Sequence, residues 1–135
     1  FKKDEPDKLI DLAELGDKGF DQALAIEHPE LDNQTEDIFI FLRKLKSQDK
    51  IVPLKIDNIQ DIHVDGGTKY LLNSLVYWKD NHYMTMFTCN NEWYKYDDGP
   101  GKRPNIIKIG NYDDLMKYED EIVKKHTTIY HYVRE

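Results

Sequence analysis

The stretch NHYMTMFTCNNEWYKYDD, residues 81–98, decides how the middle of this chain folds. Apolar and aromatic residues run from His82 to Thr88 and again from Glu92 to Tyr96, a composition typical of β-strands. Between the two runs stands Asn90-Asn91, and paired asparagines readily adopt the left-handed backbone of a two-residue type I′ turn. The stretch therefore predicts a tight hairpin of antiparallel strands.

Alternation along the first strand assigns its side chains to two faces. His82 shares one face with Met84, Met86 and Thr88, whereas Cys89, the only cysteine, belongs to the other. An extended strand also places Cys89 about 23 Å from His82. A nucleophile must lie within about 3 Å of its base, so Cys89 is excluded as the nucleophile of His82.

His82 and Asp97 lie at the same end of the predicted hairpin. His82 opens the first strand and Asp97 follows the second, so the asparagine turn brings them together. A carboxylate at this place can hold an imidazole in one tautomer through its Nδ1 proton, and a histidine held in this way can act as a base. A purely structural pair would give the same pattern, and the residues alone leave both interpretations open.

The remainder of the chain predicts an α+β arrangement in a single domain. Residues 1–36 indicate a helical segment, with one helix from Asp4 to Leu15 and a second, short helix that begins at Phe20 and ends before His28-Pro29. Residues 37–135 indicate an antiparallel sheet of about six strands and one late helix, which Asn111 caps and which runs to Lys125. Besides the hairpin, the expected strands or extended pieces are Ile38–Leu42 (covered on both faces), Ile51–Ile56, Ile59–Val64, Tyr70–Trp78, Ile106–Ile109 and Thr127–Val133, in an order that the pattern leaves open.

Composition disfavours several classes of partner. The chain has 135 residues and a formal net charge of −7, with acidic and basic residues mixed along it, so no basic stripe marks a nucleic-acid interface. The acidic balance suits a basic or neutral protein partner. No apolar run approaches the roughly 18 residues that a membrane span needs, and the charged first residues do not resemble a signal peptide. We expect no membrane association and an intracellular location, cytoplasmic or nuclear.

Neither a metal ion nor a cofactor is expected. A single cysteine rules out a thiolate zinc site and is compatible with a reducing compartment. Ser74 and Thr68 have no neighbours at a spacing that would activate a hydroxyl nucleophile. Metal-ligand spacing is also lacking among the remaining histidines, His28, His63, His126 and His131.

Several motifs in order resemble the C-terminal half of the ubiquitin-specific proteases, a family of papain-like cysteine peptidases. That family shows Tyr-x-Leu, then Gly-His-Tyr, then Trp-x-x-Phe-Asp-Asp, then a closing aromatic strand. The strand Ile38–Leu42 with Arg43 is also similar to the family's Leu-x-Leu-Lys-Arg-Phe strand, so the resemblance covers residues 37–135. The segments that match the family's motifs are Tyr70–Trp78, Asn81-His82-Tyr83, Trp93–Asp98 and Tyr130–Arg134.

The resemblance implies a sheet like the palm of these proteases and a role for each matching residue. His82 matches the catalytic base, Asp97 matches the acid that orients it, and Asp98 matches an adjacent acid that can assist. Tyr83 would help to shape the channel for the ubiquitin tail. Asn81 stands in that channel where the family has a glycine. Ubiquitin or a ubiquitin-like protein would be the partner.

The nucleophile of that family is missing from this chain. Its Asn-x-Gly-Asn-x-Cys box carries the cysteine and an oxyanion-hole side chain, and nothing between Phe1 and Gln34 replaces it. We therefore expect the chain to be inactive alone, with an N-terminal cysteine-bearing segment outside it completing the site. Two alternatives stay open. One is an inactive protease-like scaffold that binds ubiquitin or another protein, and the other is an unrelated α+β protein whose motifs converge on this pattern.

Overall fold

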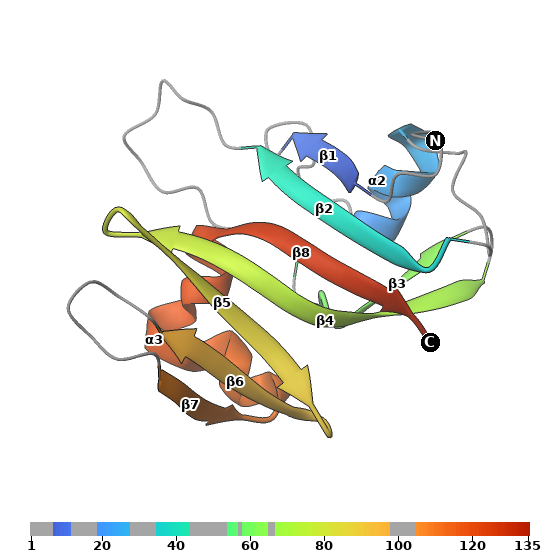
Figure 1. Cartoon of the computed structure of the whole chain (residues 1–135). Helices are drawn as coiled ribbons and strands as arrows, with labels where there is room; N and C mark the ends of the chain where they lie inside the picture. Colours follow the sequence, from blue (N-terminus) through green and yellow to red (C-terminus); the bar gives the residue numbers. More distant parts are fainter. Residues whose placement is uncertain are drawn as a thin grey trace.

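The computed structural model describes residues 7–11, 19–27, 35–43, 54–56, 58–64, 67–97 and 105–135 (Figure 1). The strands are β1 (Asp7–Asp11), β2 (Asp37–Arg43), β3 (Asp61–Val64), β4 (Thr68–Lys79), β5 (His82–Cys89), β6 (Glu92–Asp97), β7 (Asn105–Gly110) and β8 (Thr127–Arg134), and the helices are α2 (Phe20–Glu27) and α3 (Tyr112–His126). Eight strands form one sheet in the order β1-β2-β8-β4-β5-β6-β7, with β3 paired to β4. The expected α+β fold with an antiparallel sheet is confirmed, although the sheet has eight strands rather than about six.

The last strand of the chain, β8, lies in the middle of the sheet. Residues 37–41 of β2 pair with residues 129–133 on one edge of β8, and residues 70–77 of β4 pair with residues 127–134 on the other. The second edge of β4 is divided, because β3 pairs with its first part and β5 with its last part. The end of the chain therefore joins the N-terminal strands to the central meander.

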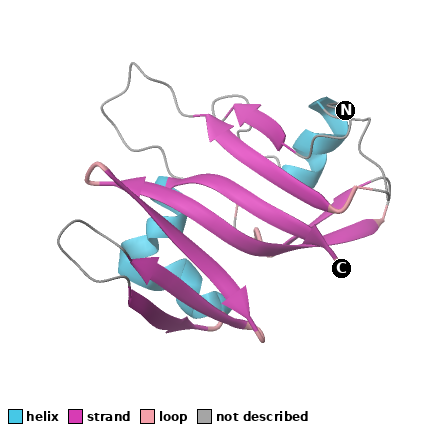
Figure 2. Ribbon diagram, viewed as in Figure 1, coloured by secondary structure: helices cyan, strands magenta, loops and turns pink. Residues whose placement is uncertain are grey.

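One face of the sheet carries the core, and both helices lie behind that face (Figure 2). Along β2 the buried Ile38, Ile40 and Leu42 alternate with half-buried side chains, so the prediction that both faces of this strand are covered is wrong. Helix α2 packs its Phe20 ring 5.1 Å from the ring of Tyr130. The other large buried side chains of the core strands are Tyr70, Leu72, Leu75, Tyr77, Met86, Trp93 and Tyr132.

Both hairpin turns of the meander use left-handed backbone. Asn90 and Asn91 have φ angles of 53° and 64°, which confirms the predicted asparagine turn. The connection between β4 and β5 is Asp80-Asn81, with φ angles of 54° and 60°. Asparagine and aspartate tolerate this conformation better than other non-glycine residues, so local sequence favours both turns that flank β5.

The N-terminal segment differs from the prediction of two helices. The second helix is confirmed as α2, but residues 7–11 form β1, which pairs in parallel with β2. A short helix is marginal in water by itself, whereas the outer edge of β2 offers a row of unpaired main-chain groups. Pairing with that edge satisfies both backbones, so tertiary contact overrides the helical spacing. Of the other expected pieces, residues 61–64 form β3, and residues 54–56 lie outside the sheet.

Helix α3 begins as the sequence predicts. The Asn111 side chain accepts a hydrogen bond from the Asp114 amide at 2.9 Å, and the Asp114 carboxylate accepts one from the Asn111 amide at 3.0 Å. This capping box satisfies two of the donors that a helix start leaves unpaired. The helix is interrupted at 118–121. Tyr118 is extended there, and Glu119, Asp120 and Glu121 adopt left-handed backbone with φ angles of 46°, 59° and 61°.

We predict that the two central tyrosines of β8 respond oppositely to loss of the hydroxyl. Tyr132 donates a hydrogen bond to the Ile59 carbonyl at 2.6 Å, so Tyr132→Phe should lower the free energy of unfolding by about 1–3 kcal/mol. The buried Tyr130 hydroxyl has no hydrogen-bond partner among the described residues, so Tyr130→Phe should be neutral or stabilising. Urea denaturation of both variants tests this. Equal destabilisation by the two changes would contradict it.

We also predict that stability falls at alkaline pH. Burial raises the pKa of Tyr130 and of Tyr132 above the ordinary value of about 10. Between pH 10 and the folded pKa, the unfolded chain releases these protons while the folded chain retains them. Stability should therefore be complete below pH 10 and decrease above it, by up to about 1.4 kcal/mol per pH unit for each tyrosine. The Tyr130→Phe variant should show a shallower decrease in urea titrations across this range.

Candidate functional site

The structure brings His82 and Asp97 to one face and one end of the β5–β6 pair. Thr85 lies opposite Tyr96, and continuing this register by one residue sets Met84 opposite Asp97. His82 is then a diagonal neighbour of Asp97, a position at which Cβ atoms are about 7–8 Å apart or slightly less. Both side chains are half-buried. An imidazole and a carboxylate that extend toward each other can span this separation.

The imidazole of His82 is directed into the protein, and its Nε2 atom is buried. A cavity of about 410 Å³ opens beside the β4–β5 turn, with Lys79, Asp80 and Glu119 among the residues of its wall. His82 does not line this cavity. A base has to present a nitrogen to its nucleophile, so the Nε2 atom is not open to an incoming thiol in this conformation.

Asn81 and Tyr83 occupy different environments on either side of His82. Asn81 is exposed in the turn with φ 60°, where glycine is the preferred residue and asparagine the best substitute. The backbone that the family pattern assigns to glycine is therefore available to Asn81. Tyr83 points to the opposite face of the sheet, where it is 59% exposed and its ring lies 4.4 Å from that of Trp78. The structure does not bring Tyr83 together with His82.

Cys89 and Asp98 do not contribute to the geometry around His82. Cys89 is exposed at the far end of β5, where it pairs with Glu92, and it lies on the face away from His82, as alternation predicts. Asp98 lies outside the residues that the structure describes.

A buried cation next to this end of the sheet was not predicted from the sequence. Lys95 is 7% exposed, and its ammonium lies 3.3 Å from a Glu119 carboxylate oxygen and 5.5 Å from the centre of the Tyr118 ring. Burial by itself lowers the pKa of Lys95, but Tyr77, Tyr118 and Glu119 together raise it above its usual value. Lys95 precedes Asp97 by two residues on the same face, so a positive charge lies next to the candidate acid.

On the face of the sheet away from the core, a second histidine, His131, lies in a row of polar side chains. His131 Nε2 lies 2.8 Å from Asp37 Oδ1, His131 Nδ1 lies 3.2 Å from Ser74 Oγ, and the ring stacks on Phe39 at 4.2 Å. These are the distances of an acid–imidazole–hydroxyl relay, although the sequence spacing gave Ser74 no support. Ser74 stands mid-strand between β5 and β8, so the ladder uses the backbone amides that an oxyanion hole would need. We therefore interpret the row as a structural link across β2, β8 and β4.

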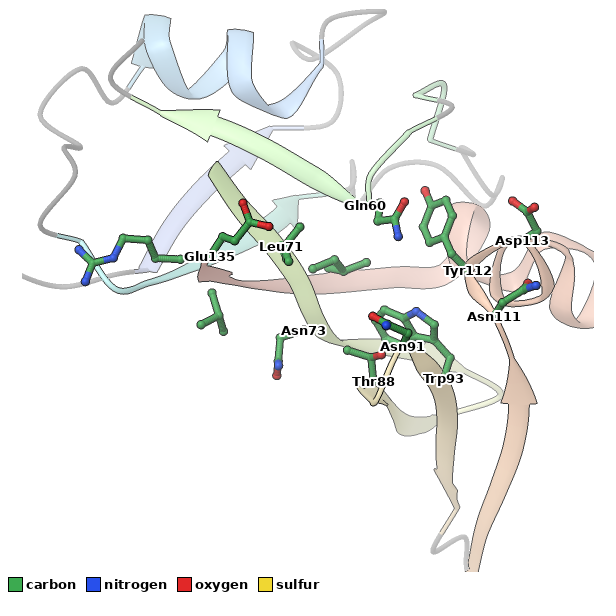
Figure 3. A pocket seen from close by; sticks show the side chains of 13 residues that line it. Gln60, Leu71, Asn73, Thr88, Asn91, Trp93, Asn111, Tyr112, Asp113 and Glu135 are labelled. Carbon is green, nitrogen blue, oxygen red and sulfur yellow. The ribbon is translucent and has the colours of Figure 1, made fainter. Parts of the chain in front are cut away.

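A larger cavity lies at the opposite end of β5 from His82 (Figure 3). Its volume is about 580 Å³, and its wall comes from the start of α3, the β5–β6 turn, β4 and the segment before β3. Four carboxamide side chains, from Gln60, Asn73, Asn91 and Asn111, contribute to this wall. These residues are far apart in the sequence and share no motif, so the sequence does not predict that they meet. It predicts only single positions, such as Asn91 in a turn and Asn111 at a helix cap.

The described part of the chain offers neither a metal site nor a membrane-spanning helix. No group of three or more histidine, cysteine, aspartate or glutamate side chains is placed there to hold a metal ion. Among the same residues, neither helix has the length and apolar character needed to cross a bilayer.

The sequence matches no model of a known protein family, and no curated protein matches it at a significant level. The resemblance to ubiquitin-specific proteases therefore rests on the motifs themselves, chiefly Asn81-His82-Tyr83 and Trp93–Asp98, of which residues 82–83 lie on β5 and residues 93–97 on β6.

Proposed function

We propose that this chain is the His/Asp-bearing half of a thiol hydrolase that resembles the ubiquitin-specific proteases. The observation that carries the proposal is the placement of His82 and Asp97 on one face at one end of the β5–β6 pair. The left-handed backbone of Asn81 supports it, because this residue can replace the family's glycine without a change of turn. The hydrolase would act inside the cell, in the cytoplasm or nucleus.

In this proposal Asp97 orients the His82 imidazole, and Asp98 assists. His82 takes the proton of a cysteine that a segment outside these residues supplies, and the resulting thiolate attacks the carbonyl carbon at the ubiquitin C-terminus. His82 then gives the proton to the leaving amine, and water hydrolyses the thioester. Because Nε2 of His82 is buried, docking of the cysteine-bearing segment has to rotate the imidazole outward before the first proton transfer.

We predict that hydrolysis of a ubiquitin–fluorophore conjugate by the full-length protein depends on His82. His82→Ala should lower kcat/KM about 10²–10⁴-fold, the range for loss of a general base. Asp97→Asn should lower it as well, because the imidazole loses the group that fixes its tautomer.

Cys89→Ser is the matched control for this experiment. Cys89 is exposed at the distal end of β5, so its replacement should leave kcat/KM unchanged. Circular dichroism checks that each variant is folded. Activity that survives His82→Ala, or that disappears with Cys89→Ser, would rule out the proposed site.

A second candidate is a binding module without catalytic activity. The buried Nε2 of His82 favours it, since an imidazole that serves only to hold the sheet end has no need to face solvent. Asn81 also favours it, because its side chain would narrow a channel that the family keeps open with glycine. In this case the domain would bind ubiquitin or another protein without cleaving it.

We predict that a binding module and a hydrolase half differ in their dependence on His82. For a binding module, ubiquitin should produce saturable shifts in the NMR spectrum of the 135-residue chain, and His82→Ala should leave the dissociation constant within about twofold. The full-length protein should then show no turnover of a ubiquitin–fluorophore conjugate. Absence of any shift at high ubiquitin concentration would exclude ubiquitin as the ligand of such a module.

A further inference from the structure

The larger cavity occupies a fork in the sheet, and the fork leaves an opening between two strands. One edge of β4 pairs with β3 as far as Leu71 and with β5 from Ser74 onward. Asn73 lies between these stretches, and the register of β4 with β8 shifts by one residue at the same point. A bulge of this kind turns a strand and exposes a residue that the ladder does not use. The cavity opens here because β3 and β5 diverge.

The wall of the cavity is rich in carboxamides that face solvent. Gln60, Asn73 and Asn91 are exposed, and each offers two donors and one acceptor. The Oδ1 atom of Asn111 already accepts the capping hydrogen bond of α3. This side chain therefore offers a ligand only the two donors of its amide nitrogen. Figure 3 shows these side chains around the opening, with Trp93 at its base.

The hydroxyl of Tyr112 adds a further donor. It accepts a hydrogen bond from the Ile59 amide at 3.0 Å, and burial raises the pKa of Tyr112. The hydroxyl therefore keeps its proton at neutral pH. Together with the carboxamides, it gives the cavity both donors and acceptors, and a main-chain peptide group can pair with both.

Charge at the rim is negative. Asp113 and Glu135 contribute exposed carboxylates to the lining. Arg134 is the cation of the rim, and its guanidinium already lies 3.3 Å from the Glu36 carboxylate. The rim therefore keeps a negative charge, which has the same sign as the formal net charge of −7 of the whole chain. A ligand with a positive side chain is therefore favoured over an acidic one.

We propose that this cavity binds an extended peptide segment of a partner protein that carries a basic side chain. Carboxamides pair with both the N–H and the C=O of a main chain, and exposed Leu71 offers an apolar contact for a neighbouring side chain. A sugar fits less well, because it stacks on an open aromatic face and Trp93 is only 4% exposed. The volume of about 580 Å³ is within the usual range for ligand sites.

The site is separate from the one around His82. Residue 88 of β5 lines the cavity and residue 82 begins the same strand, so about 20 Å of extended chain lies between them. The inference therefore does not rest on the proposed hydrolase function, and either one can fail without the other.

The test is NMR titration of the 135-residue chain with acetyl-Val-Lys-Val-Lys-amide and with acetyl-Val-Glu-Val-Glu-amide. The lysine peptide should produce saturable shifts in the side-chain NH₂ signals of Gln60, Asn73 and Asn91, and the glutamate peptide should bind at least several-fold more weakly. Asn91→Gly should weaken binding of the lysine peptide about five- to tenfold, as expected for the loss of one or two hydrogen bonds.

Asn90→Gly is the matched control. Asn90 and Asn91 share the turn and its left-handed backbone, with φ angles of 53° and 64°, but only Asn91 lines the cavity. Glycine tolerates this backbone, so both variants should fold and only Asn91→Gly should lose affinity. Asn73→Leu, on a different strand, should lose affinity as well. Shifts that do not saturate at millimolar peptide, equal binding of the two peptides, or equal effects of Asn90→Gly and Asn91→Gly would each overturn the proposal.

Discussion

Strand β8 pairs with β2 on one edge and with β4 on the other, and these two ladders hold the N-terminal strands and the meander in one sheet. This strand supplies Tyr130 and Tyr132, which are fully buried against α2 and the middle of the sheet. Because β8 is last in the chain, its two ladders close the longest loops of the fold, and the entropy lost in closing them has to be offset by dense aromatic packing. The hydrogen bond from Tyr132 to Ile59 also ties the segment before β3 to this core.

This arrangement leaves β4 with one continuous edge and one divided edge, and both candidate sites follow from the division. Where β5 joins β4, the turn Asp80-Asn81 sets the start of β5 and with it His82. Where β5 and β3 separate, Asn73 bulges and a cavity opens. The histidine–aspartate pair thus lies at one end of β5, and the cavity lined by carboxamides lies at the other end. Their chemistry differs because the ion pair between buried Lys95 and exposed Glu119 lies near one end, whereas exposed amides line the other.

The described sites were accessible to sequence reasoning to different degrees. The meeting of His82 and Asp97 at one end of the hairpin followed from a turn signal only a few residues away, whereas the face they share follows from the observed register. The partners of Lys95 and His131 did not, since Glu119 is 24 residues from Lys95 and Asp37 is 94 residues from His131. A buried lysine also resembles any exposed lysine of a polar strand face until its neighbours are known. Separations of this kind carry no periodic signal.

Local sequence encodes the strands of the meander, the turn at Asn90-Asn91 and the cap at Asn111, because each depends on neighbouring residues whose backbone preferences agree. Tertiary structure alone decided that residues 7–11 form a strand, since the open edge of β2 outweighs weak helical spacing in a short segment. It also decided the place of β8 and the meeting of Asn73, Asn91 and Gln60 around one cavity. These outcomes depend on which strand edges pair over long sequence separations, a choice made by packing of the whole core rather than by any stretch within it.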